Sequence, residues 1–240
     1  MGLNLKNVPR SQNANRVEQP VLEVGTYPAR LVQIIDCGIQ PQKPYQGNEK
    51  PPAHEVRLTY ELLDVFMIDE EGNEEEDRPR WVSETITLAS PDKDLAKSTK
   101  RYKALDPDIV HDYDFTKLIG YPCMITIAHG ANKKNPDRPY ENIGNVTTMR
   151  KAQADKAVAL KNEPKVFVLD EPNLETFLSL PTWMQDYIKS NLQYAGSALE
   201  KALAGHGPAK AEGGKPPVKK AAQKPVQEEP EHDDEGDEPW

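Results

Sequence analysis

The segment His54–Leu63, HEVRLTYELL, decides the fold class of this 240-residue chain. Its polar side chains alternate with a second, mostly apolar set: His54, Val56, Leu58, Tyr60 and Leu62. Alternation with a period of two is typical of a half-buried β-strand. The chain continues through the acidic segment Asp69–Asp77 and returns as Arg80–Leu88, RWVSETITL, which alternates in the same way. We therefore predict an antiparallel hairpin with Gly72 and Asn73 at its tip.

Further strands and a helix are predicted around this hairpin. Runs of branched and apolar residues predict three more strands: Thr26–Cys37, Pro122–His129 and Tyr140–Thr148. Ser90 followed by Pro91 signals the start of a helix over residues 92–105, and a short helix is expected at Phe115–Ile119. Three strands, a helix and two strands is the order of the OB-fold. The sequence thus predicts a mainly β fold with α, a five-stranded OB-like Greek-key barrel; a generic five-stranded α+β domain is the alternative.

Composition divides the chain into four parts. Residues 1–20 are polar and predict a flexible arm, and residues 21–150 hold the OB-like domain. Residues 151–204 predict a helical extension, and residues 205–240 contain too few apolar residues to fold, which indicates a disordered tail. One face of the extension carries apolar side chains at helical spacing: Trp183, Met184, Tyr187, Ile188 and Leu192. We expect this face to pack on the barrel; a surface for a partner or for self-association is the alternative.

The net charge of −9 argues, taken as a mean, against a protein that binds nucleic acid. Two segments account for that sign. Glu228–Trp240 carries eight carboxylates and no Lys or Arg, and Asp69–Asp77 carries seven carboxylates. Residues 1–205 without the second segment have a net charge of +2. The net charge of the whole chain therefore does not exclude nucleic-acid binding by residues 1–205.

The basic residues of the body gather in three places, each with a tyrosine. The loops between the first two and the last two strands flank the oligonucleotide-binding face of an OB-fold. Single strands are held by cations along the phosphates and by aromatic planes under the bases. We predict a single-stranded DNA interface from the first loop, two facing strands, the helix and the last loop: Lys43, Tyr45, Lys50, Arg57, Tyr60, Trp81, Lys97, Lys100, Arg101, Tyr102, Lys103, Lys133, Lys134, Arg138 and Tyr140. For Tyr60 and Trp81, a core position is the alternative.

No feature of the sequence predicts an enzyme. A Gly-rich phosphate loop, a GxSxG turn and an HExxH helix are all missing. The acidic link Asp106–Asp114 invites a divalent metal, as in a nuclease, but it is irregular, whereas oxygen-ligand sites usually draw on rigid elements. We expect no catalytic residue, metal or cofactor. Cys37 and Cys123 lie in strand-like segments and predict two reduced core thiols, with a disulfide as the alternative.

The chain resembles the single-stranded DNA-binding proteins of tailed bacteriophages. The resemblance rests on GTYPARLVQIIDCGIQPQKPY (25–45), PPAHEVRLTYEL (51–62), STKRY (98–102) and an acidic tail that ends in an aromatic residue. It covers about two thirds of the chain, because the helical extension has no counterpart in the minimal OB protein. By this resemblance, the tail recruits replication proteins such as polymerase and helicase through Asp233, Asp234, Glu235, Asp237, Glu238 and Trp240.

These features together predict a non-enzymatic single-stranded DNA-binding protein of phage replication or recombination, acting in the cytoplasm of the host cell. No run of about 18 apolar residues is present, so we expect no membrane span. Three interpretations of the tail remain open: the polyanion can dock on a partner, fold back over the protein's own cations, or serve only to keep the protein in solution. The alternative function is an acidic adaptor or assembly protein that binds protein partners through the barrel and the C-terminal helices.

Overall fold

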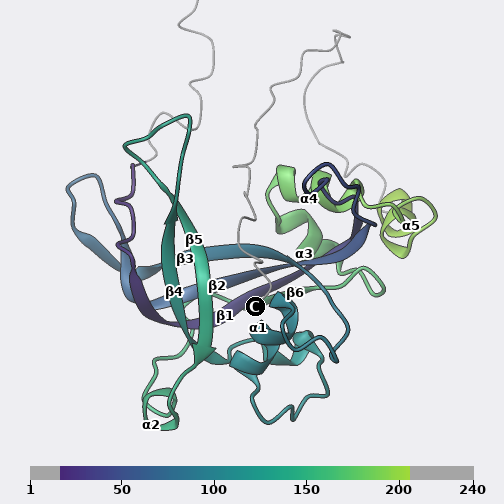
Figure 1. The fold of residues 1–240 in the computed structure, drawn as a ribbon. Helices are drawn as coiled ribbons and strands as arrows, with labels where there is room; N and C mark the ends of the chain where they lie inside the picture. Colours follow the sequence, from purple (N-terminus) through teal and green to yellow (C-terminus); the bar gives the residue numbers. More distant parts are fainter. Residues whose placement is uncertain (1–16, 206–240) are drawn as a thin grey trace, which may run out of the picture.

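The computed structural model describes residues 17–205, which form a mainly antiparallel sheet with short helices (Figure 1). The sheet has six strands in the order β3-β2-β1-β4-β5, with β6 pairing parallel to β1. It curls until β3 and β5 lie next to each other, but no backbone pairing joins them, so the sheet is not closed. The strands are β1 (Gly25–Gln40), β2 (Ala53–Ile68), β3 (Glu74–Thr87), β4 (Pro122–Gly130), β5 (Tyr140–Thr148) and β6 (Lys165–Phe167).

The predicted hairpin is confirmed as the antiparallel pair β2 and β3. Its inward face carries the apolar half of the alternation, and the other half faces outward. The turn is shorter than the sequence suggests: the Asp69 amide donates to the Asn73 carbonyl (3.0 Å), and β3 already begins at Glu74. Half of the acidic segment is therefore strand, because backbone pairing of Met67 with Glu75 outweighs the low strand propensity of the carboxylates.

The main core lies inside the curled sheet, where all five long strands contribute buried side chains. Among those that are fully buried are Leu31, Leu58, Tyr60, Leu62, Ile125 and Ile127. Cys123 belongs to this core, whereas Cys37 lies in a second core on the other side of β1. Both thiols are free and buried, and burial raises the pKa of each to about 12. The prediction of two core thiols is confirmed, and the disulfide alternative is wrong.

The second core holds the helical extension against β1. It combines Ile35 and Cys37 of β1 with Phe167 of β6 and with buried residues of the helices, among them Phe177, Met184, Ile188 and Leu199. The helices concerned are α3 (Leu174–Ser179), α4 (Thr182–Lys189) and α5 (Ala198–Gly205). Asn173 caps α3, since its side chain accepts from the Thr176 amide (3.0 Å). Of the predicted apolar face, Met184 and Ile188 are buried, whereas Trp183 and Leu192 remain exposed.

Two irregularities let β1 serve both cores. The pairing of β1 with β2 shifts between Leu31 and Gln33, and again between Asp36 and Gly38. Such bulges bend a strand and increase its twist. Gly38 has a positive φ of 76°, and a Cβ there would lie 2.8 Å from the Asn191 side chain. The second bulge thus requires glycine where the extension approaches the sheet.

The helix after β3 is shorter than predicted. Helix α1 spans Lys97–Leu105, and its N-cap residue is Ala96 instead of the predicted Ser90. The Ser90 hydroxyl bonds the Asp92 carboxylate instead of a helix amide, and the Lys93 amide donates to the Ser90 carbonyl in a turn. The remaining helical segments are a 3₁₀ turn, η3 (Phe115–Leu118), and α2 (Lys151–Ala154). None of the helices between residues 17 and 205 has the length and apolar character that crossing a membrane requires.

Candidate nucleic-acid interface

The outward face of the β2–β3 hairpin brings two of the predicted residues, Arg57 and Trp81, into one row. Register pairs Trp81 with Glu61, Ser83 with Thr59, and Thr85 with Arg57. Trp81 is 38% exposed, whereas Glu61 and Thr59 are buried. We call this row of Trp81, Ser83, Thr85 and Arg57 the outer row. It presents an aromatic ring, two hydroxyls and a guanidinium in line along adjacent strands.

Glu61 fixes the Trp81 end of the outer row. Its carboxylate accepts from the Trp81 indole Nε1 (3.2 Å) and from the backbone amides of Lys161 (2.7 Å) and Asn162 (3.2 Å). The Asn162 side-chain amide donates to it as well (2.7 Å). A buried carboxylate with several donors holds its partners strongly. Glu61 therefore orients the indole and ties the chain around residues 161–162 to the sheet.

Arg57 forms the other end of the outer row. Its guanidinium carbon lies 5.0 Å from the centroid of the Trp183 ring, and Nη1 donates to the Thr85 hydroxyl (3.2 Å). Trp183, at the start of α4, is 43% exposed. The extension thus adds an aromatic plane at the Arg57 end of the sheet. Thr85, which pairs with Arg57, lies four residues along β3 from Trp81, or about 13 Å. Sequence reasoning identified Trp183 only as part of an apolar helix face, because α4 and β2 are far apart in the chain and no local pattern relates them.

The loop between β1 and β2 keeps its predicted character. Lys43, Tyr45 and Lys50 are all exposed, and the Lys50 ammonium lies 4.8 Å from the Tyr45 ring centroid. The Tyr45 and Asn48 backbones bond each other in both directions (2.9 Å each), which makes the loop a tight turn. In Figure 1 this loop lies near α4, the helix whose Trp183 contacts Arg57.

The loop between β4 and β5 lies on the opposite side of the molecule from the β1–β2 loop (Figure 1). Lys133 and Lys134 are exposed, and Arg138 and Tyr140 are half-buried. Arg138 forms an ion pair with Glu18, and its Nη2 donates to the Gln19 carbonyl (3.0 Å). The two basic loops do not form one cluster in this structure.

Three predicted contact residues are core residues instead. Tyr60, Arg101 and Tyr102 are each at most 2% exposed, so no base or phosphate reaches them in this structure. The Tyr60 hydroxyl faces Glu84 (3.4 Å), and burial raises the pKa of Tyr60 well above its ordinary value. The Tyr102 hydroxyl donates to Asp106 (3.1 Å). These placements correct the prediction, and for Tyr60 they decide for the core alternative.

Arg101 is buried because it joins α1 to two strands. Its Nε donates to Glu84 of β3 (2.7 Å), and Nη2 donates to the Ile143 carbonyl of β5 (3.3 Å). The other cations of α1 are more exposed: Lys100 is free of the core, Lys97 lies 3.3 Å from Glu84, and Lys103 pairs with Asp94 (2.7 Å). Only one side of the predicted basic helix therefore faces solvent.

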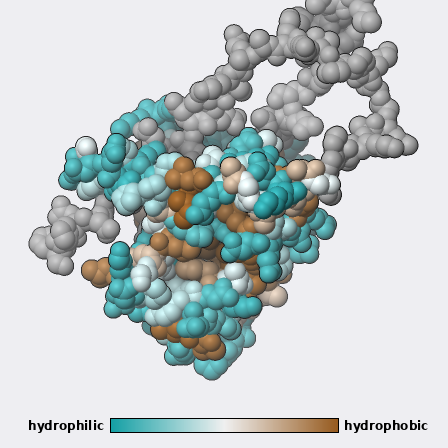
Figure 2. Space-filling view, turned by 90° about the vertical axis from the view of Figure 1, so that its right-hand side faces the viewer, coloured by the Kyte–Doolittle hydropathy of each residue, from teal (hydrophilic) through white to brown (hydrophobic). Residues whose placement is uncertain are grey.

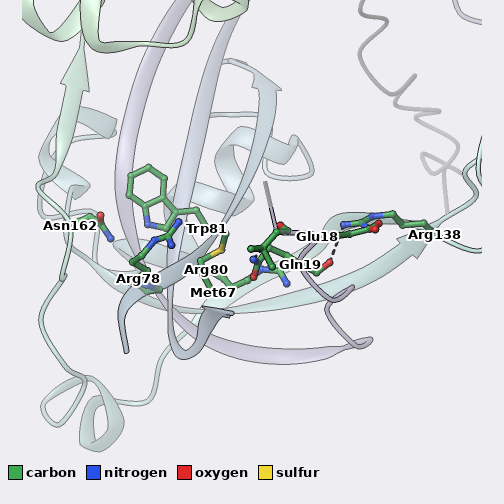
Figure 3. A pocket seen from close by; sticks show the side chains of 10 residues that line it. Glu18, Gln19, Met67, Arg78, Arg80, Trp81, Arg138 and Asn162 are labelled. Carbon is green, nitrogen blue, oxygen red and sulfur yellow. Dashed lines mark hydrogen bonds and ion pairs between the residues drawn. The ribbon is translucent and has the colours of Figure 1, made fainter. Parts of the chain in front are cut away.

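A cavity of about 710 Å³ opens beside Trp81 (Figure 3). Sequence reasoning missed most of the side chains around it. The residues that line it come from five separate segments: Val17, Glu18, Gln19, Met67, Arg78, Pro79, Arg80, Trp81, Arg138 and Asn162. The one available signal was Arg78, an exposed cation three residues before Trp81 in a strand. Gln19 and Asn162 have no such signal, since only the tertiary fold brings them to β3.

The acidic link Asp106–Asp114 is organised by the backbone. The Asp106 carboxylate accepts from the amides of Val110 (3.0 Å) and His111 (2.9 Å). Burial alone would raise the pKa of Asp106, but these hydrogen bonds hold it below its usual range. Within residues 17–205, no group of three or more His, Cys, Asp or Glu side chains is placed to hold a metal ion. The acidic tail lies outside the described residues, and with it Asp233, Asp234, Glu235, Asp237, Glu238 and Trp240.

The chain matches no known protein-family model, and no curated protein matches it significantly.

Proposed function

We propose that this protein binds single-stranded DNA without enzymatic activity, as part of a phage replication or recombination system. The observation that carries the proposal is the outer row. Trp81 of β3 is exposed, Arg57 of β2 is half-buried beneath the exposed Trp183 ring of α4, and the β1–β2 loop with Tyr45 and Lys50 lies near α4 (Figure 1). Aromatic planes with adjacent cations bind unpaired bases and phosphates with little sequence preference.

The strand arrangement supports an OB-like barrel as the framework. Helix α1 falls between β3 and β4, and the order β3-β2-β1-β4-β5 brings β3 and β5 together at the open side. Side chains span that opening: Arg80 of β3 pairs with Glu141 of β5 (2.9 Å), and Arg101 contacts both strands. We propose that these contacts replace the backbone pairing of a closed barrel. OB-folds use the corresponding strand face and its flanking loops for oligonucleotides.

We further propose that the C-terminal tail recruits replication proteins. Its charge supports this role, because eight carboxylates followed by Trp240 offer a basic partner both long-range attraction and one apolar anchor. Residues 228–240 contain no Lys or Arg, so the proposed contacts with DNA fall to cations elsewhere in the chain.

The proposal is tested by titrating the full-length protein with poly-dT at about 50 and 200 mM salt. We expect quenching of tryptophan fluorescence, and three phosphate contacts would lower the affinity roughly 20-fold over that range. Trp81→Phe should remove the part of the quenching that comes from the indole on the sheet, and Trp183 should account for the rest. An unchanged affinity at both salt concentrations would contradict the proposal.

A second candidate function is an adaptor that binds protein through the extension. It is favoured by the exposed apolar side chains Leu178, Trp183 and Leu192. Figure 2 shows the side of the molecule where α4 and α5 lie in Figure 1, and apolar side chains gather in the middle of this face, between hydrophilic regions. Absence of both quenching and a gel shift at low salt would favour this function over DNA binding.

A further inference from the structure

The cavity beside Trp81 has the dimensions and the lining of a ligand site. Its volume of about 710 Å³ falls in the range of small-molecule pockets. It is elongated: Figure 3 shows Asn162, Trp81 and Arg78 at one end and Arg138 at the other, with Met67, Glu18 and Gln19 between them. The lining therefore combines one aromatic ring, a thioether and amides with a guanidinium at each end.

The aromatic wall is pre-oriented. Glu61 accepts from the Trp81 indole Nε1, so the ring is held at one edge while 38% of the residue stays exposed. The same carboxylate holds the Asn162 side-chain Nδ2 (2.7 Å). Because that nitrogen is engaged, the Asn162 carbonyl oxygen is the end of the amide that remains to accept a hydrogen bond. A flat ring beside a fixed acceptor matches a nucleobase, which offers a π face and N–H groups at its edge.

Arg78 and Arg138, at the two ends of the cavity, are more exposed than Arg80 in its wall. Arg80 is buried and paired with Glu141, and it also donates to the Pro20 carbonyl, so it supports the wall. Arg78 is more open: its side chain is 60% exposed, and its partner Glu75 lies on the same strand near the surface. Arg138 is 38% exposed and pairs with Glu18, which is 77% exposed. A phosphate can replace either carboxylate, since surface ion pairs contribute little.

We propose that this cavity takes one unstacked nucleotide of the bound DNA strand, with its base on Trp81 and its flanking phosphates at Arg78 and Arg138. The inference rests on the proposed function, because it takes the strand as already lying across the outer row. The ligand is a unit of the strand rather than a free nucleotide. The two guanidinium groups lie at opposite ends of the cavity, and a base within a strand has a phosphate on each side.

The test is a double-mutant cycle between Trp81 and the base. The shortest dT oligonucleotide that binds the full-length protein with full affinity is prepared with one abasic residue at each position in turn. We expect an abasic residue at the position that enters the cavity to lower the affinity roughly 5- to 150-fold, the range for loss of one stacked base. Trp81→Ala should cost a similar factor with the intact oligonucleotide and nothing further with that one abasic oligonucleotide.

Matched variants keep the result interpretable. Trp183→Ala removes the other exposed indole of residues 17–205, and its loss should add to the abasic loss at the position that is coupled to Trp81, because Trp183 contacts a different base. Trp81→Phe keeps a ring and should restore the coupling, and thermal melting shows whether each variant is folded. Asn162→Ala removes the proposed hydrogen-bond acceptor, and its loss of affinity should be coupled to the same abasic position as that of Trp81→Ala.

The outcomes separate the inference from the function on which it rests. If oligonucleotides bind but the abasic series is flat, or if the Trp81→Ala loss adds to every abasic loss, the cavity does not take a base and the inference is overturned while DNA binding stands. If dTMP alone binds as tightly as the oligonucleotide, the cavity is a free-nucleotide site and the strand assignment is wrong. If no oligonucleotide binds at any salt concentration, the proposed function itself fails.

Discussion

Arg101 shows how the environment of a single residue decides between surface and core. In sequence it belongs to the basic run Lys100–Lys103, which predicts a cationic surface. In the structure its guanidinium lies between β3 and β5 and is paired with Glu84. A run of like charges on a helix includes positions that face inward, and a guanidinium is tolerated there only when a carboxylate and carbonyls satisfy it.

Arg101→Leu should therefore lower stability rather than DNA affinity alone. Removing Arg101 leaves the buried Glu84 with only the more distant Lys97 (3.3 Å) as a cationic partner, and we expect a loss of up to about 3–5 kcal/mol in the free energy of unfolding. Urea denaturation measures it. Lys100→Leu, on the exposed side of the same helix, is the matched control and should change stability by less than about 0.5 kcal/mol. Equal stability of the two variants would place Arg101 at the surface.

His54 and Asp36 form a residue pair whose effect depends on pH. The His54 Nε2 lies 2.6 Å from the Asp36 carboxylate, which also accepts from the amides of Gly38 and Leu169. The hydrogen bond to Asp36 raises the pKa of His54 against the opposing effect of burial. Burial raises the pKa of Asp36, but the hydrogen bonds from His54 and the two amides lower it below its ordinary value.

The two shifts together define a pH window. A raised His54 pKa contributes stability below its unfolded value, about 6.5, which is lost as the pH rises through the folded value. A lowered Asp36 pKa contributes stability above its unfolded value, about 3.9, which is lost as the pH falls. We expect His54→Asn to reduce stability most between about pH 4 and 6.5 and to match the wild type near pH 9. Urea denaturation across this range measures the difference in the free energy of unfolding. A difference independent of pH would contradict a charged His54–Asp36 pair.

At the scale of elements, Gly38 couples β1 to the extension. The Leu192 amide donates to the Ile39 carbonyl (2.9 Å), so the chain after α4 lies against the bulge in β1. Sequence predicts the strand, because branched residues run through it. It does not predict the bulge, since a bulge depends on the register with β2 and on what packs over it.

Gly38→Ala and Gly47→Ala separate backbone strain from packing. Both glycines have φ near +80°, where a side chain costs roughly 1–2 kcal/mol. A Cβ at Gly38 also meets Asn191 at 2.8 Å and Leu169 at 2.9 Å, whereas nothing lies within 4 Å of one at Gly47. Overpacking should add about 1–3 kcal/mol at Gly38 alone. Chemical denaturation measures the loss in the free energy of unfolding of each variant. Equal losses would show that the extension moves to make room for the added methyl group at Gly38 without a measurable cost.

Most elements of the sheet were predictable, because a strand with one buried face alternates with a period of two. The strand β6 was visible only as the short apolar run KVFVLD, and three residues are too few to show a period. The start of α1 was misplaced for a different reason. Ser90-Pro91 is a valid start signal, but the Ser90 hydroxyl has a nearer acceptor in Asp92.

At the scale of the whole molecule, charge separation is the leading feature. The body carries the cations that the proposed function needs, and residues 228–240 carry eight carboxylates. Deletion of Glu228–Trp240 changes the formal charge from −9 to −1. We expect the truncated protein to bind poly-dT more tightly at low salt, because less repulsion opposes the approach of the strand.

Fluorescence titration of the full-length and truncated proteins measures this effect. The gain should shrink at about 200 mM salt, where exposed charges are screened beyond roughly 8 Å. A gain that persists there would indicate a direct contact between the tail and the DNA-binding face. An unchanged affinity at every salt concentration would show that the tail neither repels nor competes with DNA.

The sequence by itself determined the five long strands, the two core thiols and the uneven distribution of charge, because these follow from local period and composition. Only the tertiary structure decided which cations and rings are free. Arg101, Tyr60 and Tyr102 are buried, Trp183 joins Arg57, and Gln19 and Asn162 reach the cavity beside Trp81. The physical reason is that exposure depends on contacts between segments far apart in the chain, and no local pattern of residues records which segment covers which face.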